Sequence, residues 1–94
     1  MSALEELKEQ LRKEGFVSVY DWRDEPGVTY PPHKHKGRVS MYVVEGEVTM
    51  TFSDKEIRLK AGDRFDVPVG QEHKATVGKD GCVYVVGEEI EGDS

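Results

Sequence analysis

From residue 16 onward, apolar and polar residues alternate with a period of two, and this pattern constrains the fold most strongly. Val48, Met50 and Phe52 alternate with polar neighbours, and Ile57 and Leu59 do the same. A strand of this kind buries one face and exposes the other, as in antiparallel sandwiches and barrels. With only 94 residues available, the chain is expected to form one all-β domain with a single core.

Glycine, proline and aspartate divide this region into short segments. The predicted strands are 16–22, 28–36, 39–44, 47–52, 57–60, 64–67, 73–77 and 82–87. We expect Glu45 and Gly46 to form a hairpin turn, and residues 79–81 to form another turn. The last strand is apolar on both faces at 83–86, so an N-terminal helix or a second subunit is expected to cover it.

The two ends of the chain differ from the barrel region 16–87. Ser2 and Glu5 form a capping-box pattern, and leucines follow at helical spacing, which predicts a helix within residues 1–15. We expect this helix to lie on its own sheet or on a dimer mate. Four carboxylates lie within 88–94, and they predict a solvated, mobile acidic tail.

Composition narrows the classes of partner. The net charge is −6, and the acidic tail supplies most of it, so charge alone says little about partners. Lys34, Lys36 and Arg38 lack interleaved aromatic residues, so we interpret them as a solvated strand face and predict no nucleic-acid binding. No apolar stretch is long enough to cross a bilayer. The single cysteine, Cys82, excludes an intramolecular disulfide and fits a cytoplasmic protein. We also expect a homodimer.

All three histidines are predicted to face one interior. His33 and His35 are two residues apart, roughly 7 Å along a strand, and the lysines beside them belong on the wet face. His73 shares its parity with Ala75 and Val77. One divalent ion would satisfy three buried imidazoles, with nitrogen–metal bonds of about 2.1 Å. The alternative is that each histidine is a hydrogen-bonded core residue.

Two segments carry a family resemblance. Residues 27–35, with Gly27, five further residues and then His33-Lys34-His35, resemble the first cupin motif, which 42–46 continue. Residues 62–73 resemble the second motif, with Gly62, Pro68, Gly70 and His73 in register. Fifteen residues, 47–61, separate the two motifs. The chain is therefore identified as a cupin, and the resemblance implies a double-stranded β-helix (jelly-roll) barrel with His33, His35 and His73 as metal ligands.

The match departs from the family pattern at two positions. Val39 occupies the place of the acidic metal ligand, four residues after His35, and Val77 occupies the place of an asparagine that often closes the second motif. The site thus resembles the three-histidine cupins. Three neutral imidazoles leave a divalent ion at +2, which favours an anionic ligand. Zinc, iron, manganese, nickel and copper all remain candidates, and loss of the metal site is the alternative.

These residues predict a small metal-dependent enzyme, of the dioxygenase type, acting on an anionic or enolisable small molecule. No carboxylate is expected to line the interior, so no general base is left, which argues against isomerase chemistry. The alternative is a non-catalytic module that binds a metal and a small ligand. The predicted substrate pocket comprises Arg38, Val39, Met41 and Tyr84. Cys82 is expected to be a small core residue, and Asp66 has no assigned role.

Overall fold

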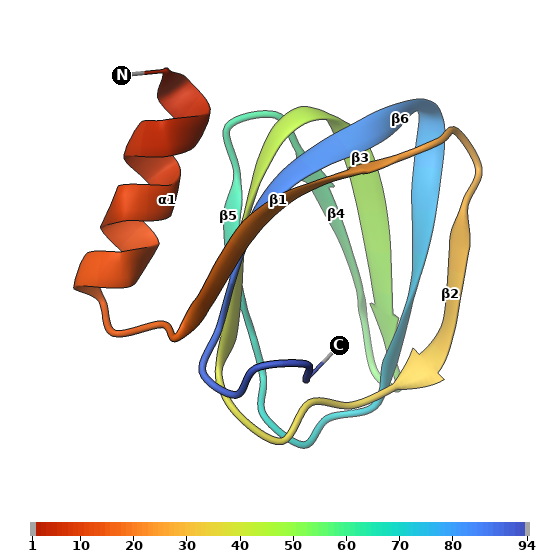
Figure 1. Ribbon diagram of the computed structural model, residues 1–94. Coiled ribbons are helices and arrows are strands. Elements are labelled where there is room, and N and C mark those ends of the chain that lie inside the picture. Colours follow the sequence, from red (N-terminus) through yellow and green to blue (C-terminus); the bar gives the residue numbers. More distant parts are fainter. Residues whose placement is uncertain (1, 94) are drawn as a thin grey trace.

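Two long antiparallel strands form the frame of the molecule. The computed structural model describes residues 2–93, and in it β3 (Val39–Phe52) pairs with β6 (His73–Glu88) along most of its length. The remaining strands pair with one half of this frame each (Figure 1). They are β1 (Ser18–Asp24), β2 (Thr29–His33), β4 (Glu56–Lys60) and β5 (Arg64–Val67).

The register shows how one frame makes two sheets. The first half of β3 pairs with the second half of β6, and β1 and β5 flank these two halves. The second half of β3 pairs with the first half of β6, and β2 and β4 flank them. Each long strand therefore runs from one sheet into the other. The predicted all-β jelly-roll barrel with an N-terminal helix is confirmed.

The long strands bend at two facing glycines. Gly46 and Gly81 have φ of 75° and 77°, and the β3–β6 register shifts beside Gly46. A Cβ at Gly46 would collide with the carbonyl oxygen of Gly81, so the close approach requires glycine. The predicted hairpin turns at 45–46 and 79–81 are therefore wrong. Each is a bulge that bends a continuous strand, because the pairing of β3 with β6 resumes beyond it in a shifted register.

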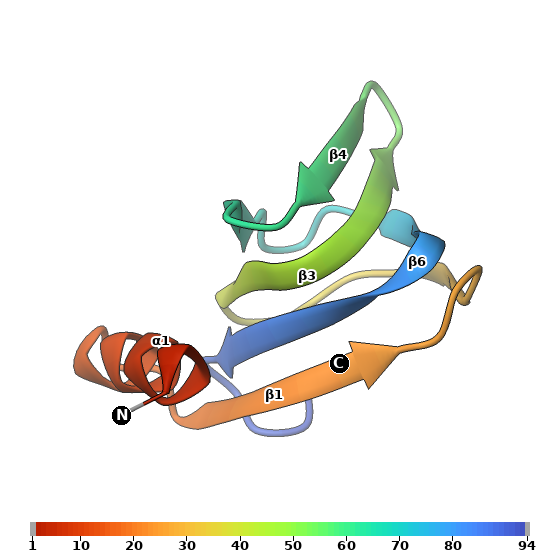
Figure 2. The ribbon, with the colours of Figure 1, turned by 90° about the horizontal axis from the view of Figure 1, so that it is seen from above.

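The helix α1 (Ala3–Lys13) covers the outer face of β6 (Figure 2). The Ser2 hydroxyl oxygen accepts a hydrogen bond from the backbone N–H of Glu5 at 3.2 Å, as the capping pattern predicts. Leu11, Phe16 and Val85 form the buried contact. The apolar outer face of the last strand is thus covered by the helix of the same chain.

An ion pair fixes the end of the helix to β5. The Arg64 guanidinium donates to both carboxylate oxygens of Glu14, at 2.6 and 2.8 Å. These hydrogen bonds lower the pKa of Glu14 to about 2. Arg64 also donates to the hydroxyl oxygens of Tyr42 and Ser40. The same guanidinium therefore connects the helix with the outer face of β3 and β5.

The acidic tail is bound to the barrel through residue 93. Glu88 ends β6 with 2% of its surface exposed, and the Tyr20 hydroxyl donates to it at 3.0 Å. The Asp93 carboxylate accepts from the backbone N–H groups of Lys36 and Gly37 at 2.9–3.0 Å. The prediction of a solvated, mobile tail is wrong for these residues, since buried and backbone donors fix their carboxylates.

The space between the two sheets is filled by one apolar cluster. Its buried members are Val39, Met41, Val43, Val48, Met50, Phe52, Leu59, Val67, Ala75, Val77, Cys82 and Tyr84. Cys82 is 2% exposed, and burial raises the pKa of its thiol to about 11. Cys82 is therefore an unreactive core residue, as predicted.

Asp66 lies on the outer side of the barrel and accepts a hydrogen bond from the buried Ser40 hydroxyl at 2.6 Å.

Leu11→Ala is expected to destabilise the protein by about 2–4 kcal/mol, because the side chain is fully buried between helix and sheet. Val17→Ala is the matched control, since Val17 is 70% exposed and should change stability by about 0.5 kcal/mol or less. Urea unfolding followed by circular dichroism measures both. Equal effects of the two substitutions would contradict the docking of α1 on β6.

Candidate metal centre

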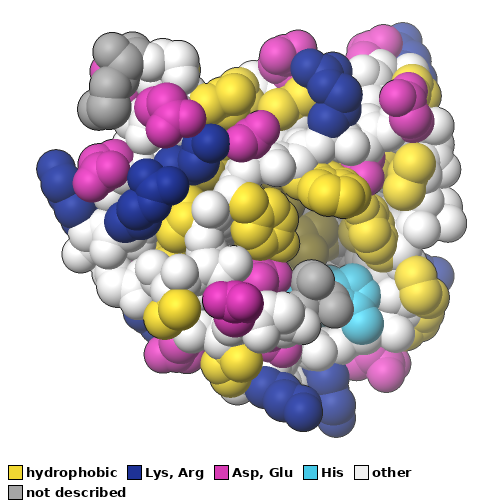
Figure 3. All heavy atoms as spheres, in the orientation of Figure 1, with side chains coloured by type: hydrophobic (Ala, Val, Ile, Leu, Met, Phe, Trp, Pro, Cys, Tyr) yellow, Lys and Arg dark blue, Asp and Glu magenta, His cyan; other side chains and the backbone are white. Residues whose placement is uncertain are grey.

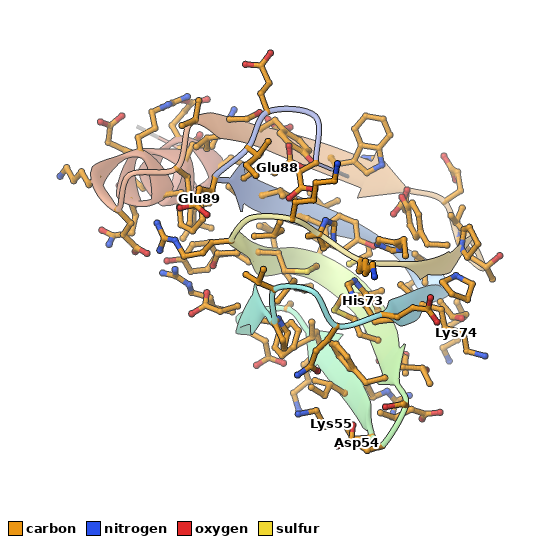
Figure 4. The ribbon with its side chains drawn as sticks, turned by 90° about the horizontal axis from the view of Figure 1, so that it is seen from below. Asp54, Lys55, His73, Lys74, Glu88 and Glu89 are labelled. Carbon is orange, nitrogen blue, oxygen red and sulfur yellow. The ribbon has the colours of Figure 1, made fainter. Side chains whose placement is uncertain are left out.

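Three histidines from two strand ends and one loop meet inside the barrel. One ring nitrogen from each of His33, His35 and His73 lies within 4.8 Å of the others. His33 ends β2 and pairs with His73, which begins β6. The predicted convergence of the three histidines on one interior is confirmed, and Figure 4 shows His73 on the inner side near this end of the barrel.

His35 reaches the cluster from a loop, although a strand was predicted there. β2 ends at His33, and its register with β6 shifts between Tyr30 and His33. The two prolines in this stretch have no N–H to donate, which interrupts the ladder. The backbone oxygen of His35 instead accepts from the N–H of Gly70 at 3.0 Å. This bond holds the loop beside the second cupin-like motif.

Hydrogen bonds assign the same tautomer to all three imidazoles. The Nδ1 atoms of His33 and His73 lie 2.8 and 2.9 Å from the backbone oxygens of Pro31 and Gln71. The Nδ1 of His35 is bonded to the backbone oxygen of Asp93. A carbonyl oxygen can only accept, so each ring must carry its hydrogen on Nδ1. In the neutral form of such a ring the lone pair is on Nε2, which is the arrangement of a metal-binding histidine.

The Nε2 atom of His73 is buried and has no hydrogen-bond partner among the described residues. Burial, with smaller contributions from the two neighbouring histidines, lowers the pKa of His73, so its ring stays neutral. The Phe52 ring lies 5.1 Å from the His73 ring, between centroids. A buried acceptor without a donor is costly unless a cation fills the space before it.

The metal-type cluster in residues 2–93 contains histidines alone. Val39, at the position where the family pattern has an acidic ligand, is buried in the apolar core. Val77 is buried there too. The donor set is thus three neutral nitrogens, and it fits a borderline ion such as zinc or a divalent first-row metal.

Two openings lie beside the histidines. A cleft of about 430 Å³ runs past His73 between Phe52 and Gln71, with Pro32 and Lys74 on its walls. On another side, the space-filling view shows a hollow framed by β1, β2 and the C-terminal segment, with histidine atoms at its edge (Figure 3). Hydrophobic side chains line most of this hollow, and Asp or Glu atoms show at its margins.

The inner wall also carries two carboxylates that the sequence analysis missed. Asp24 is 8% exposed and accepts from Trp22 Nε1 at 2.9 Å, from the Tyr30 hydroxyl at 2.7 Å and from the Tyr84 hydroxyl at 3.0 Å. Glu88 is the second buried carboxylate. The expectation that no carboxylate lines the interior is therefore wrong. The missed signal is parity, because Asp24 alternates with Trp22 in a strand that continues to Asp24.

The residues of the predicted substrate pocket lie in two places. Val39, Met41 and Tyr84 face the inner cluster between the sheets. Arg38 lies outside it, with its guanidinium 4.7 Å from the centre of the Phe16 ring and 3.7 Å from the Glu89 carboxylate. Arg38 and Val39 both line a smaller cavity of about 140 Å³ near Glu14. A role for these four residues in substrate binding stays a prediction.

A two-sheet barrel of this topology, with histidines converging at one end, defines a double-stranded β-helix protein with a candidate metal centre. The family profile described as "Cupin domain" matches residues 20–87, which is more than half of the chain. The chain belongs to the cupin family.

Three similar solved structures agree with this assignment, and two of them are described as cupins. A protein from Shewanella frigidimarina that contains a cupin-2 domain is 28% identical with a TM-score of 0.63, over 72% of this chain and 65% of that one. KdgF from Halomonas sp. is 25% identical with a TM-score of 0.64, over 80% and 70%. An RmlC-like cupin from Shewanella frigidimarina is 26% identical with a TM-score of 0.69, over 83% and 70%.

The chain covers slightly less than two thirds of the length of the first of these proteins.

No curated protein sequence matches the chain. Within residues 2–93, no helix has both the length and the apolar character that a membrane span needs.

Asp93→Ala should speed hydrogen exchange at the backbone N–H groups of Lys36 and Gly37, because the substitution removes their acceptor. The loop that carries His35 would then lose one of the contacts that fix it. Exchange measured by nuclear magnetic resonance tests this, with Glu91→Ala as the control, since Glu91 is an exposed carboxylate of the same segment. Unchanged exchange in Asp93→Ala would show that the tail does not hold the loop.

Proposed function

We propose that this cupin binds one divalent metal ion through the Nε2 atoms of His33, His35 and His73, and that it uses the ion to bind a small anionic or enolisable molecule. The observation that carries the proposal is the buried, unpartnered Nε2 of His73. It belongs to a ring whose other nitrogen is already bonded to a backbone oxygen. An ion in front of Nε2 would satisfy this atom and its two neighbours together.

The backbone positions the ligands before any ion arrives. Each Nδ1–H donates to a backbone oxygen, and two of these oxygens, those of Pro31 and Gln71, lie only two residues from their histidine. Such bonds fix the rotation of the ring and raise the basicity of the free nitrogen. The third oxygen comes from Asp93, so the C-terminal segment takes part in orienting His35.

The charge of the site favours an anionic ligand. Three neutral imidazoles add no negative charge, and Val39 supplies none at the position of the acidic ligand of the family pattern. A bound divalent ion would supply Lewis acidity and, for iron, manganese, nickel or copper, redox chemistry. The chain itself holds Phe52 against His73, and both line an open cleft through which a ligand would approach this end of the barrel.

The proposed reaction class is dioxygenation. Two carboxylates, Asp24 and Glu88, lie on the inner wall of the described barrel, and both already accept hydrogen bonds from phenols. A third, the exposed Glu72, lines the cleft beside His73. Asp24 and Glu88 are both buried and already engaged by aromatic donors, so they are poorly placed to contact a substrate, which favours chemistry at the metal over isomerisation by a side-chain base. The same observation also favours a second candidate, a module that binds metal and ligand without turnover. Assembly as a homodimer and a cytoplasmic location remain part of the proposal.

Wild-type protein treated with chelator and then with zinc is expected to bind one equivalent, and His73→Ala should lower the affinity by about 100-fold or more. Isothermal titration and elemental analysis after gel filtration measure this. Lys34→Ala is the matched control, because Lys34 lies between two ligands in sequence yet is exposed. Equal substoichiometric binding by wild type and His73→Ala would refute the three-histidine site.

Protein reconstituted with iron should consume oxygen with at least one member of a panel of 2-oxo acids, diketones and thiol acids. An oxygen electrode measures the rate, and His73→Ala should reduce it to the level of buffer, since metal retention requires that ligand. Lys34→Ala should retain the wild-type rate. Inactivity with every reconstituted metal and every compound would favour the binding module over the enzyme.

A further inference from the structure

A distant part of the chain orients one of the three histidines. In the other two, Nδ1 is bonded to a backbone oxygen that lies two residues earlier in the chain. The Nδ1 of His35 is bonded instead to the backbone oxygen of Asp93, which lies 58 residues later. A hydrogen bond at Nδ1 fixes the rotation of the ring and so the direction of Nε2. The direction of Nε2 in His35 therefore depends on where the residues around Asp93 lie.

His35 lies in a loop that takes no part in a sheet. β2 ends at His33 and β3 begins at Val39, so residues 34–38 form the loop between them. Inside it, the backbone oxygen of His35 accepts from the N–H of Gly70 at 3.0 Å. The rest of the loop is bonded to residues 89–93, which follow β6 and curve back toward the loop (Figure 1). We call residues 89–93 the strap.

Both ends of the strap are hydrogen-bonded to the loop. At one end, the Asp93 carboxylate accepts from the N–H groups of Lys36 and Gly37 at 2.9–3.0 Å. At the other end, the Glu89 N–H donates to the backbone oxygen of Arg38, and the Glu89 carboxylate accepts from the Arg38 N–H, both at 2.9 Å. Hydrogen bonds from backbone donors to a carboxylate are stronger than those between neutral groups. The loop and the strap are therefore ordered together.

Between these bonds, the middle of the strap packs on the loop without being buried. A Cβ at Gly37 would lie 2.9 Å from the Ile90 side chain, so Ile90 rests directly on the backbone of the loop. Ile90 is nevertheless 45% exposed, and the strap contains no strand. A segment with few buried apolar contacts opens at a lower free energy than the sheet beside it. The strap can therefore open while the barrel stays folded.

We propose that the strap controls the metal affinity of the three-histidine centre. The closed strap fixes the direction of Nε2 in His35 and so raises the affinity for the ion, and Asp93 acts as the positioning residue. The proposal rests on the proposed metal function and adds a means of regulating that same site. Coupling between two equilibria is reciprocal, so metal binding must favour the closed strap by the same factor.

Titration with zinc compares strap variants of the full chain. Asp93→Ala should lower the zinc affinity about ten-fold, because it releases the strap that orients His35. Asp93→Asn removes the same charge but keeps an acceptor oxygen, so its affinity should stay within about three-fold of wild type. Glu91→Ala removes an exposed carboxylate of the strap and should leave the affinity unchanged. Equal losses in Asp93→Ala and Asp93→Asn would assign the effect to charge and would overturn the positioning role.

Nitrogen nuclear magnetic resonance of the imidazoles tests the positioning role without any metal. In chelator-treated wild type, each of the three rings should carry its hydrogen on Nδ1. In Asp93→Ala, His35 alone should populate both tautomers. His33 and His73 should keep theirs, because their acceptors lie within their own segments. A change in all three rings would indicate general damage to the fold, and this result or the absence of any change would overturn the proposal.

Hydrogen exchange tests the reciprocal effect of the metal on the strap. Saturating zinc should slow exchange at the Glu89 N–H, which joins the strap to the loop, by about ten-fold in wild type and much less in Asp93→Ala. The Asp63 N–H is the internal control, because it lies in the β4–β5 turn at the other end of the barrel (Figure 1). Exchange at Glu89 that does not respond to zinc in wild type would overturn the coupling.

Failure of the strap and failure of the metal site give different results. If chelator-treated wild type takes up no zinc, the three-histidine site is refuted, and the strap proposal is refuted with it. If wild type binds one equivalent and Asp93→Ala binds zinc equally tightly, the metal site stands and the strap proposal is overturned. If circular dichroism shows that Asp93→Ala is unfolded, Glu89→Ala replaces it and should lower the affinity about three-fold or more. Wild-type affinity in Glu89→Ala would then overturn the proposal.

Discussion

The pairing of β3 with β6 is the constraint on which the rest of the structure depends. Each of these strands takes part in both sheets, and at their bends Gly46 approaches the carbonyl of Gly81 so closely that no side chain fits between them. The bend brings the start of β6 and the end of β2 to one end of the barrel, where His73 meets His33. It also brings the other half of β6 against β1, where Asp24 meets Tyr84.

Backbone oxygens decide what the histidines can do. An imidazole in water exchanges its hydrogen between two nitrogens, whereas each ring here has one nitrogen bonded to a carbonyl that cannot donate. The nitrogen left without a backbone partner is therefore the same atom, Nε2, in all three rings, and the three rings meet in one cluster. The two carboxylates of the inner wall, Asp24 and Glu88, accept their hydrogen bonds from aromatic side chains instead. One barrel thus contains a cluster of three histidines and two buried carboxylates on β1 and β6.

Some predictions depended on local pattern alone, and these agree with the structure. The period-two alternation, the capping pattern at Ser2 and the inward parity of His33 and His73 all follow from neighbouring residues. The wrong predictions concern residues whose contacts lie far away in the chain. Gly46 and Gly81 suggested turns because glycine readily adopts the positive φ that many turns require. A bulge requires the same φ, and only the pairing with the neighbouring strand distinguishes a bulge from a turn. The tail suggested a mobile end, because the N–H groups that donate hydrogen bonds to it, those of Lys36 and Gly37, are more than fifty residues away in the chain.

The sequence by itself determined the class of fold, the cupin motifs and the set of three histidines, since residue type and spacing carry that information. The tertiary structure decided that His35 reaches the cluster from a loop, that Asp93 orients it and that Asp24 and Glu88 lie inside. It also placed Arg38 outside, against Phe16 and Glu89. The physical reason is that a hydrogen bond or an ion pair depends on the distance between two atoms, and for residues far apart in the chain only the folded sheet sets that distance.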